Sequence, residues 1–160
     1  MDLYLHFGMR KTGTTSIQDT LFHGLATGDW QYVKFAMPNA SGPVVRAFDS
    51  RFNYKPGPMS KEEQSVGAET IARRRKRGMA NFERVLGAIE APRALLSAES
   101  IIHLKAEDLA SLVETTRKYA NRIIGVGYLR SPKSYFESEY QEILKAKLVR
   151  VHEHRQYMNY

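Results

Sequence analysis

The sequence predicts a three-layer α/β domain in which helices flank a mainly parallel central sheet. Short apolar runs rich in β-forming residues alternate along the chain with longer stretches whose apolar residues recur at helical spacing. The 160 residues are about one domain's worth, and 42% hydrophobic with 26% charged residues is ordinary globular composition. We therefore expect a single domain over residues 1–160.

Residues 3–21 predict a strand, a tight loop and a helix. The run at residues 3–7 is short and apolar, as in a buried strand, and Gly8 ends it. After Gly13 come three hydroxyl residues that suit a helix N-terminus, and apolar residues at helical spacing follow them. The first-turn amides of a helix are unpaired, and its dipole is positive there. The loop is therefore predicted to bind an anion, usually phosphate.

The loop departs from the nucleotide-hydrolysing pattern G-x-x-x-x-G-K-[ST] at one position. Gly8 and Gly13 have the required spacing, but Thr14 occupies the lysine position and Lys11 comes three residues earlier. This departure argues against hydrolysis of a nucleoside triphosphate. An ATP-dependent kinase stays open as an alternative, as does a plain glycine turn with a solvated Lys11.

The second strand is expected at residues 31–36, directly after Trp30. Residues 37–60 contain several prolines and glycines and are predicted to form a long loop. Such a loop is usually functional or mobile. We expect this loop either to be a variable segment on the side of the site where the acceptor substrate binds, or to be an ordinary flexible insertion.

Residues 60–63 form a capping box, which predicts a helix that ends before Pro92. Gly67 and Gly78 are expected to divide this helix. Between them, residues 73–77 are all basic. This run fits a solvated helix face, a patch for an anionic substrate or a nucleic-acid contact. No aromatic residues are interleaved to stack bases, which argues against nucleic acid as a partner.

Residues 93–98 and 122–129 predict two further strands, with an amphipathic helix at residues 108–116 between them. The strands end on Glu99 and Arg130. Ligands of open α/β sheets bind beyond the carboxyl ends of the strands. Both side chains are therefore predicted to lie on the same side of the sheet as the phosphate loop.

A last helix is predicted after Arg130, with Ser131 as its cap and Pro132 at its first position. Ser138 lies two turns into this helix, where its hydroxyl and the Arg130 guanidinium suit one phosphate monoester. Residues 149–160 predict either an interface helix or a solvated tail.

Charge and composition limit the classes of function. The net charge of +7 predicts an anionic partner, whether nucleotide, acidic glycan, nucleic acid or lipid surface. The absence of cysteine excludes disulfides and thiolate metal sites, and the five histidines have no metal-ligand spacing. No signal-peptide pattern or membrane-length apolar run is present, so we expect a cytoplasmic protein without a membrane span.

The motif Lys11-Thr12-Gly13-Thr14-Thr15 resembles the loop of the P-loop sulfotransferases, which use 3′-phosphoadenosine 5′-phosphosulfate (PAPS). The spacing of eight residues from Arg130 to Ser138 is similar to the pair that holds the 3′-phosphate in that family. The wider string from His6 to Gln18 looks most like bacterial members that act on carbohydrates. The resemblance implies a P-loop-type fold and transfer of a sulfuryl group from PAPS, without a metal, to a small-molecule or glycan hydroxyl. Carbohydrates and glycolipids are the expected acceptors.

The resemblance also implies the roles of individual residues. Lys11 would stabilise charge on the bridging oxygen, and Glu99 would be the catalytic base, with His6 and His103 as weaker candidates. The residues implied in cofactor binding are Thr12, Gly13, Thr14, Thr15, Ser16, Arg130 and Ser138.

Family members usually continue with further helices after the arginine–serine helix. The resemblance therefore implies a chain that is short at its C-terminus, a fragment, or one half of a homodimer. A non-catalytic binder of nucleotide or nucleic acid is the remaining alternative to the sulfotransferase and the kinase.

Overall fold

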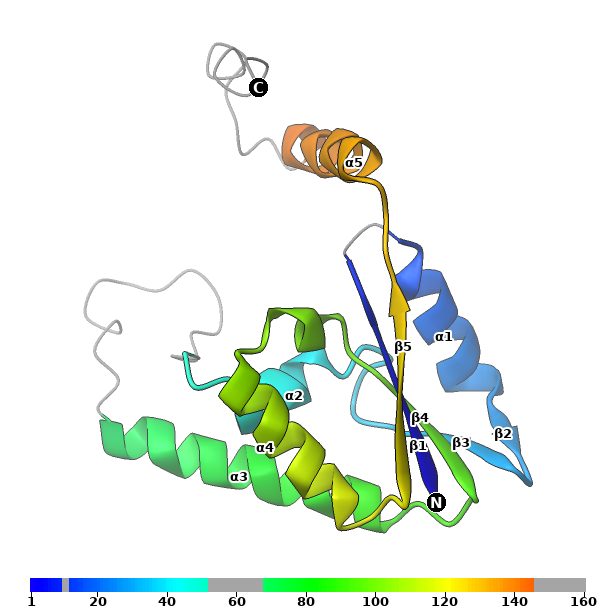
Figure 1. The fold of residues 1–160 in the computed structure, drawn as a ribbon, viewed down its shortest axis with the longest axis vertical. Coiled ribbons are helices and arrows are strands. Elements are labelled where there is room, and N and C mark those ends of the chain that lie inside the picture. Colours follow the sequence, from blue (N-terminus) through cyan, green and yellow to red (C-terminus); the bar gives the residue numbers. More distant parts are fainter. Residues whose placement is uncertain (10–11, 52–67, 146–160) are drawn as a thin grey trace.

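The computed structural model describes residues 1–9, 12–51 and 68–145, in which strands and helices alternate (Figure 1). The elements are β1 (Asp2–Gly8), α1 (Thr14–Gly24), β2 (Ala26–Thr27), β3 (Trp30–Tyr32), α2 (Ser41–Phe48), α3 (Ala68–Gly87), β4 (Arg93–Ser97), the 3-10 helix η2 (Glu99–His103), α4 (Ala106–Arg117), β5 (Arg122–Tyr128) and α5 (Pro132–Lys145).

The sheet has the strand order β2-β3-β4-β1-β5. Strands β3, β4, β1 and β5 are parallel, whereas the short edge strand β2 runs antiparallel to β3. Helices α2, α3 and α4 cover one face of the sheet, and α1 lies on the other (Figure 1). The predicted α/β class with a mainly parallel sheet flanked by helices is therefore confirmed.

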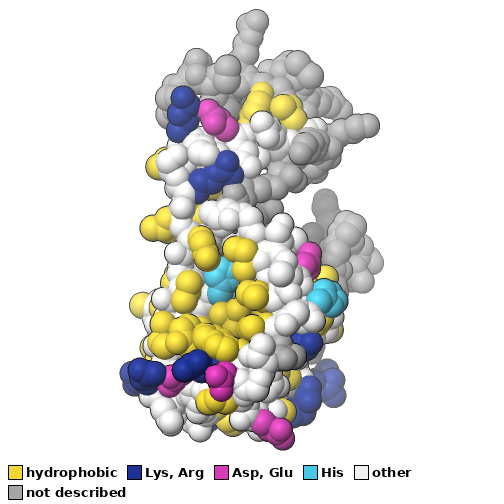
Figure 2. All heavy atoms as spheres, turned by 90° about the vertical axis from the view of Figure 1, so that its right-hand side faces the viewer, with side chains coloured by type: hydrophobic (Ala, Val, Ile, Leu, Met, Phe, Trp, Pro, Cys, Tyr) yellow, Lys and Arg dark blue, Asp and Glu magenta, His cyan; other side chains and the backbone are white. Residues whose placement is uncertain are grey.

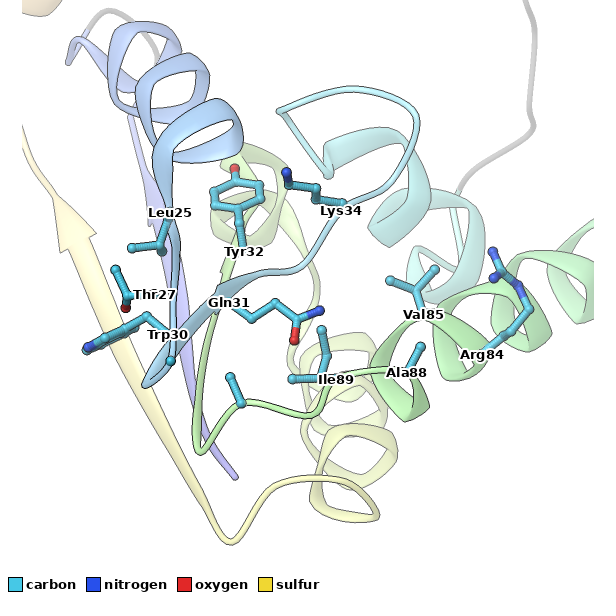
Figure 3. Close-up of a pocket in the computed structure, with 12 residues that line it drawn as sticks. Leu25, Thr27, Trp30, Gln31, Tyr32, Lys34, Arg84, Val85, Ala88 and Ile89 are labelled. Carbon is cyan, nitrogen blue, oxygen red and sulfur yellow. The ribbon is translucent and has the colours of Figure 1, made fainter.

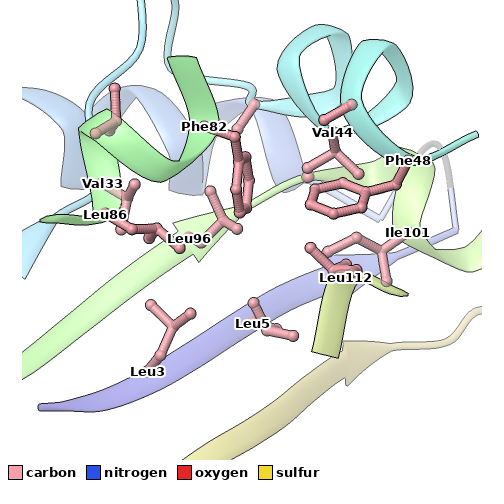
Figure 4. Close-up of a cluster of buried hydrophobic side chains, with 14 of the residues drawn as sticks. Leu3, Leu5, Val33, Val44, Phe48, Phe82, Leu86, Leu96, Ile101 and Leu112 are labelled. Carbon is pink, nitrogen blue, oxygen red and sulfur yellow. The ribbon is translucent and has the colours of Figure 1, made fainter. Parts of the chain in front are cut away.

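The main core lies between the sheet and helices α2 to α4 (Figure 4). Leu3 and Leu5 of β1 and Leu96 of β4 point toward this layer and are buried. Phe82 of α3 is fully buried, and its ring meets the ring of Phe48 edge-on at a centroid distance of 4.9 Å. These apolar contacts hold helices α2 to α4 against the sheet, and so stabilise the strands whose carboxyl ends lead to the site.

The expectation of a loop over residues 37–60 is wrong for its middle, where α2 forms. The side-chain oxygen of Asn39 accepts the Ser41 amide at 2.9 Å, just before the helix. Pro43 lies in the first turn, where a missing N–H is tolerated. Val44 and Phe48 are fully buried, so tertiary packing holds this short helix. Residues 52–60 lie outside the described residues.

The second strand is shorter than expected, since β3 ends at Tyr32 and not at residue 36. The Val33 amide still bonds to the carbonyl of Leu95 at 2.9 Å, after which the chain leaves the ladder. The Tyr32 hydroxyl donates to the carbonyl of Pro38 at 2.6 Å and holds this turn toward α2. The sequence pattern does not predict the antiparallel strand β2.

Helix α3 runs unbroken through Gly78, contrary to the expected division, and it ends at Gly87, before Pro92. A Cβ at Gly78 would lie 3.1 Å from the carbonyl carbon of Arg46, so the glycine allows α2 to pack closely. Gly67 and the capping box at residues 60–63 lie outside the described residues.

The predicted last helix exists, but α5 extends beyond the carboxyl end of β5 and away from the sheet (Figure 1). The apolar stripe of α5 is exposed to solvent, with Phe136 69% exposed and Leu144 42% exposed.

Hydrophobic side chains also gather on the molecular face that looks to the right in Figure 1 (Figure 2). Residues 149–160 lie outside the described part of the chain.

No helix in the described part of the chain is both long and apolar enough to cross a membrane.

Candidate functional site

Hydrogen bonds hold the loop between β1 and α1 at Met9 and at Thr12. The Met9 amide bonds to the Tyr128 carbonyl of β5 at 3.1 Å, and the Thr12 hydroxyl donates to the Met9 carbonyl at 2.7 Å. Gly13 adopts a left-handed φ of 81°, which glycine tolerates without strain. Lys11 lies outside the described residues.

Helix α1 begins directly after this turn. Its first intrahelical bond runs from the Ile17 amide to the Gly13 carbonyl at 3.3 Å. The amides of Thr14, Thr15 and Ser16 therefore have no acceptor within the helix. Amides without helical acceptors and the positive end of the helix dipole suit an anion at this point.

Gly8 allows β1 and β5 to approach closely where the loop begins. A Cβ at this position would lie 2.9 Å from the Tyr128 carbonyl oxygen, closer than real Cβ contacts. The carboxyl end of β1 therefore requires glycine, independently of any ligand.

Glu99 lies against the start of α1. It begins η2, directly after β4, and its carboxylate accepts a hydrogen bond from the Thr14 hydroxyl. Thr14 is only 2% exposed. The Ala98 amide bonds to the His6 carbonyl at 2.9 Å and holds this segment beside β1. The structure thus brings Glu99 to the loop.

A buried polar cluster connects β1, β4 and α1 beneath the loop. His6 Nδ1 lies 2.7 Å from Ser97 Oγ, and Gln18 Nε2 donates to the same oxygen at 3.0 Å. All three side chains are at most 3% exposed. Residue types along the chain do not predict this cluster, because it depends on the register that pairs His6 with Ser97.

The burial of His6 favours the neutral form of its imidazole. Burial lowers the pKa of the imidazole, and the negative charge of Glu99 partly opposes this shift. Its ring meets Tyr128 edge-on, with 5.3 Å between centroids. His6 Nε2 is buried and has no hydrogen-bond partner among the described residues.

We expect the free energy of unfolding to fall as the pH drops below about 6.5, the ordinary pKa of histidine. The folded chain binds a proton at His6 less readily than the unfolded chain, because burial lowers the pKa. The contribution of neutral His6 to the free energy of unfolding is therefore complete above about pH 6.5. It is lost progressively as the pH falls toward the pKa of His6 in the folded chain.

Urea unfolding at a series of pH values measures this effect, with His6→Asn as the control. The hydrogen bond from Arg122 lowers the pKa of Asp2. Protonation of Asp2, and with it the loss of this ion pair, is therefore expected only below about pH 4, outside the range assigned to His6. An unchanged pH slope between about 5 and 6.5 in His6→Asn would contradict the assignment.

Arg130 lies just before α5, and Ser138 lies within this helix. The Arg130 guanidinium donates from Nε to Ser134 Oγ at 2.6 Å, one turn before Ser138. Ser138 is half-buried on the same helix. The structure thus brings Arg130 to Ser134, which lies four residues before Ser138 on α5.

His103 ends η2 and is exposed, and its carbonyl accepts a hydrogen bond from Arg51. Residues 1–9, 12–51 and 68–145 contain no group of three or more His, Asp or Glu side chains that could hold a metal.

The basic run at residues 73–77 forms part of α3, and one of its members has a structural role. Arg75 donates to the carbonyls of Ala47 and Phe48 at 3.2 and 3.1 Å, and so caps the end of α2. The other four members are exposed. Arg74 and Arg77 line a cavity of about 420 Å³ between α2 and α3.

A second groove, of about 580 Å³, lies between β3 and the end of α3 (Figure 3). Trp30, Gln31 and Tyr32 line one side, and Val85 and Ile89 from α3 and its end line the other. The groove includes the start of β3, whereas the loop follows the carboxyl end of β1. We assign it no part in the site at the loop.

These observations define an α/β domain with a strand–loop–helix site at the carboxyl edge of its parallel strands. Compared with family models, curated proteins and solved structures, the chain gives no match. What the chain does is therefore inferred from its own residues.

Proposed function

We propose that the chain is a PAPS-dependent sulfotransferase that acts on a hydroxyl of a carbohydrate or glycolipid. The observation that carries the proposal is the environment of Thr14. In a loop that hydrolyses nucleoside triphosphates, a lysine at this position reaches the outer phosphates. Here the position holds a buried threonine whose hydroxyl binds Glu99. A carboxylate thus lies beside an anion cradle, as a catalytic base requires.

The donors near the loop fit the anionic cofactor. The amides of Thr14, Thr15 and Ser16 lack helical acceptors, and the buried Nε2 of His6 has no described partner. Arg130 adds a guanidinium after β5, suited to a second phosphate. PAPS, when bound, supplies an activated sulfuryl group and a bisphosphate leaving group.

The residues of the chain then have distinct roles. Glu99 accepts the proton of the acceptor hydroxyl, whose oxygen forms the new bond to sulfur while the bond to the leaving phosphate breaks. Lys11 stabilises the negative charge that develops on the leaving oxygen. Thr14 donates to Glu99 and orients its carboxylate toward the cradle.

A magnesium-dependent ATP kinase is the second candidate, and the same contact favours it. A hydroxyl and a carboxylate side by side are the oxygen ligands that Mg²⁺ accepts in phosphoryl-transfer sites. The kinase, however, would lack the lysine that normally follows the second glycine of its loop.

Thermal-shift titrations separate these candidates. Adenosine 3′,5′-bisphosphate is expected to stabilise the chain without metal, by about 2.7 kcal/mol at a hundredfold excess over Kd. Stabilisation by ATP with magnesium alone would identify the kinase. Stabilisation by an oligonucleotide alone, falling steeply with salt, would identify a nucleic-acid binder. Transfer from labelled PAPS to a panel of glycans then tests the acceptor.

Lys11→Ala and Arg130→Ala are expected to affect different steps. Lys11→Ala should lower kcat about 10²–10³-fold, because it removes charge stabilisation in the transition state. Arg130→Ala should raise the Kd of the bisphosphate about 10-fold or more, because it removes a charge-assisted hydrogen bond. Calorimetry and initial rates measure the two effects.

Arg117→Ala serves as the control for loss of one exposed arginine, since Arg117 lies in the last turn of α4. Equal losses of binding and turnover in Lys11→Ala and Arg130→Ala would refute this division of roles.

A further inference from the structure

His6 Nε2 is a buried polar atom whose hydrogen-bonding capacity is unmet by the described residues. His6 is only 3% exposed, so bulk water does not satisfy it. Leaving such a group unpaired is unfavourable, because nothing compensates for its loss of hydration. A polar group of this kind in a native structure calls for an explanation, such as a bound water or ion, strain, or a functional contact.

The other ring nitrogen is already engaged, and its partner indicates where the imidazole proton lies. Ser97 Oγ accepts a hydrogen bond from Gln18 Nε2 at 3.0 Å, which leaves its own proton to donate. His6 Nδ1 lies 2.7 Å away and can accept this proton. A neutral imidazole that accepts at Nδ1 carries its proton on Nε2. In this arrangement Nε2–H is a donor that has no acceptor among the described residues.

The position of His6 relates this donor to the site. His6 lies two residues before Gly8, on the side of β1 that meets α1 through Ser97 and Gln18. The charge of Glu99 acts on the ring, and Tyr128 packs against it. The neighbouring first turn of α1 presents amides without helical acceptors. The unpaired donor thus belongs to the same end of the sheet as the anion cradle.

We propose that His6 is a ligand-binding residue whose Nε2–H donates a hydrogen bond to an oxygen of the anion held at the N-terminus of α1. This inference rests on the proposed function, in which that anion is the 5′-phosphate of adenosine 3′,5′-bisphosphate or PAPS. A neutral donor there adds a directed bond without adding charge beside Glu99. Ser97 and Gln18 orient the ring for this contact.

Two substitutions separate the two nitrogens of His6. Asparagine places its amide near the position of Nδ1 and can keep the contact with Ser97, whereas glutamine reaches the position of Nε2. We expect His6→Asn to raise the Kd of the bisphosphate about 10-fold, the usual effect of losing a hydrogen bond to a charged group. His6→Gln should bind within about 3-fold of the unaltered chain, although it unfolds more easily.

Calorimetry measures these affinities, and thermal unfolding without ligand reports whether each variant is folded. Equal affinity in His6→Asn and the unaltered chain would overturn the inference. So would a loss in His6→Gln as large as that in His6→Asn, because a merely structural role predicts that result.

Nitrogen-15 NMR of the unaltered chain tests the inference without any variant. We expect His6 to be protonated at Nε2, and we expect the Nε2 resonance to shift when the bisphosphate is added. The Tyr32 hydroxyl is a second hydrogen-bond partner of Ser97. If Ser97 donates to this hydroxyl and not to His6, Nε2 will lack a proton and the inference fails. Bisphosphate binding that leaves this resonance unmoved also overturns it, while the proposed function stands. A chain that does not bind the bisphosphate refutes both.

Discussion

Replacing Glu99 with glutamine should lower kcat about 10²–10⁴-fold, the usual contribution of a general base. The amide cannot take the proton of the acceptor hydroxyl. Its oxygen can still accept the hydrogen bond from Thr14, so the start of α1 should keep its structure. Initial rates with saturating PAPS and acceptor measure the loss.

The affinity of this variant for adenosine 3′,5′-bisphosphate distinguishes a base from a binding residue. The Glu99 carboxylate is a negative charge beside the proposed phosphate site, so its removal should leave the Kd unchanged or lower it. Glu114→Gln provides a matched control, because Glu114 is an exposed residue of α4. A normal kcat in Glu99→Gln would remove this residue from the reaction, and a large rise in Kd would indicate binding instead.

The position of Glu99 could be predicted from the sequence because it follows from strand direction. Residues 93–98 are a short apolar run, and a parallel strand places the residue after it at the carboxyl edge of the sheet. The same reasoning placed the loop after Gly8. At these two places local residue types mark where the strand ends, whereas the end of β3 at Tyr32 and the start of α2 were not predicted in this way.

The contacts beneath the loop could not be predicted in this way. His6 meets Ser97 only because β1 and β4 pair with one particular register, across 91 residues of sequence. A shift of one residue would turn either side chain to the opposite face. The sequence shows which polar residues lie on each strand, but it does not determine which of them become neighbours.

Helix α2 shows how tertiary packing can outweigh local residue types. Gly42 and Pro43 suggested a loop, yet Val44, Ala47 and Phe48 recur at helical spacing and bury completely against the core. This apolar spacing is the signal that would have identified the helix. An eight-residue helix is marginal alone, so burial of these side chains decides its existence.

Phe82→Ala is expected to destabilise the fold by about 3–5 kcal/mol, the usual cost of removing a buried phenylalanine ring. Phe82 is fully buried, and its ring contacts Phe48 of α2 and stacks on Phe35 at 5.9 Å. Its removal opens a cavity between α3 and α2, next to the ring of Phe48. Because a domain of this size has only about 5–15 kcal/mol of stability, the variant should unfold at much lower urea concentration.

Phe136→Ala is the matched control, because it removes the same side chain from a position that is 69% exposed. Its free energy of unfolding should change by no more than about 0.5 kcal/mol. Urea unfolding followed by circular dichroism measures both variants. Equal destabilisation by the two would show that the α5 surface is packed as firmly in solution as the core around Phe82, and would contradict the arrangement in which α5 extends away from the sheet.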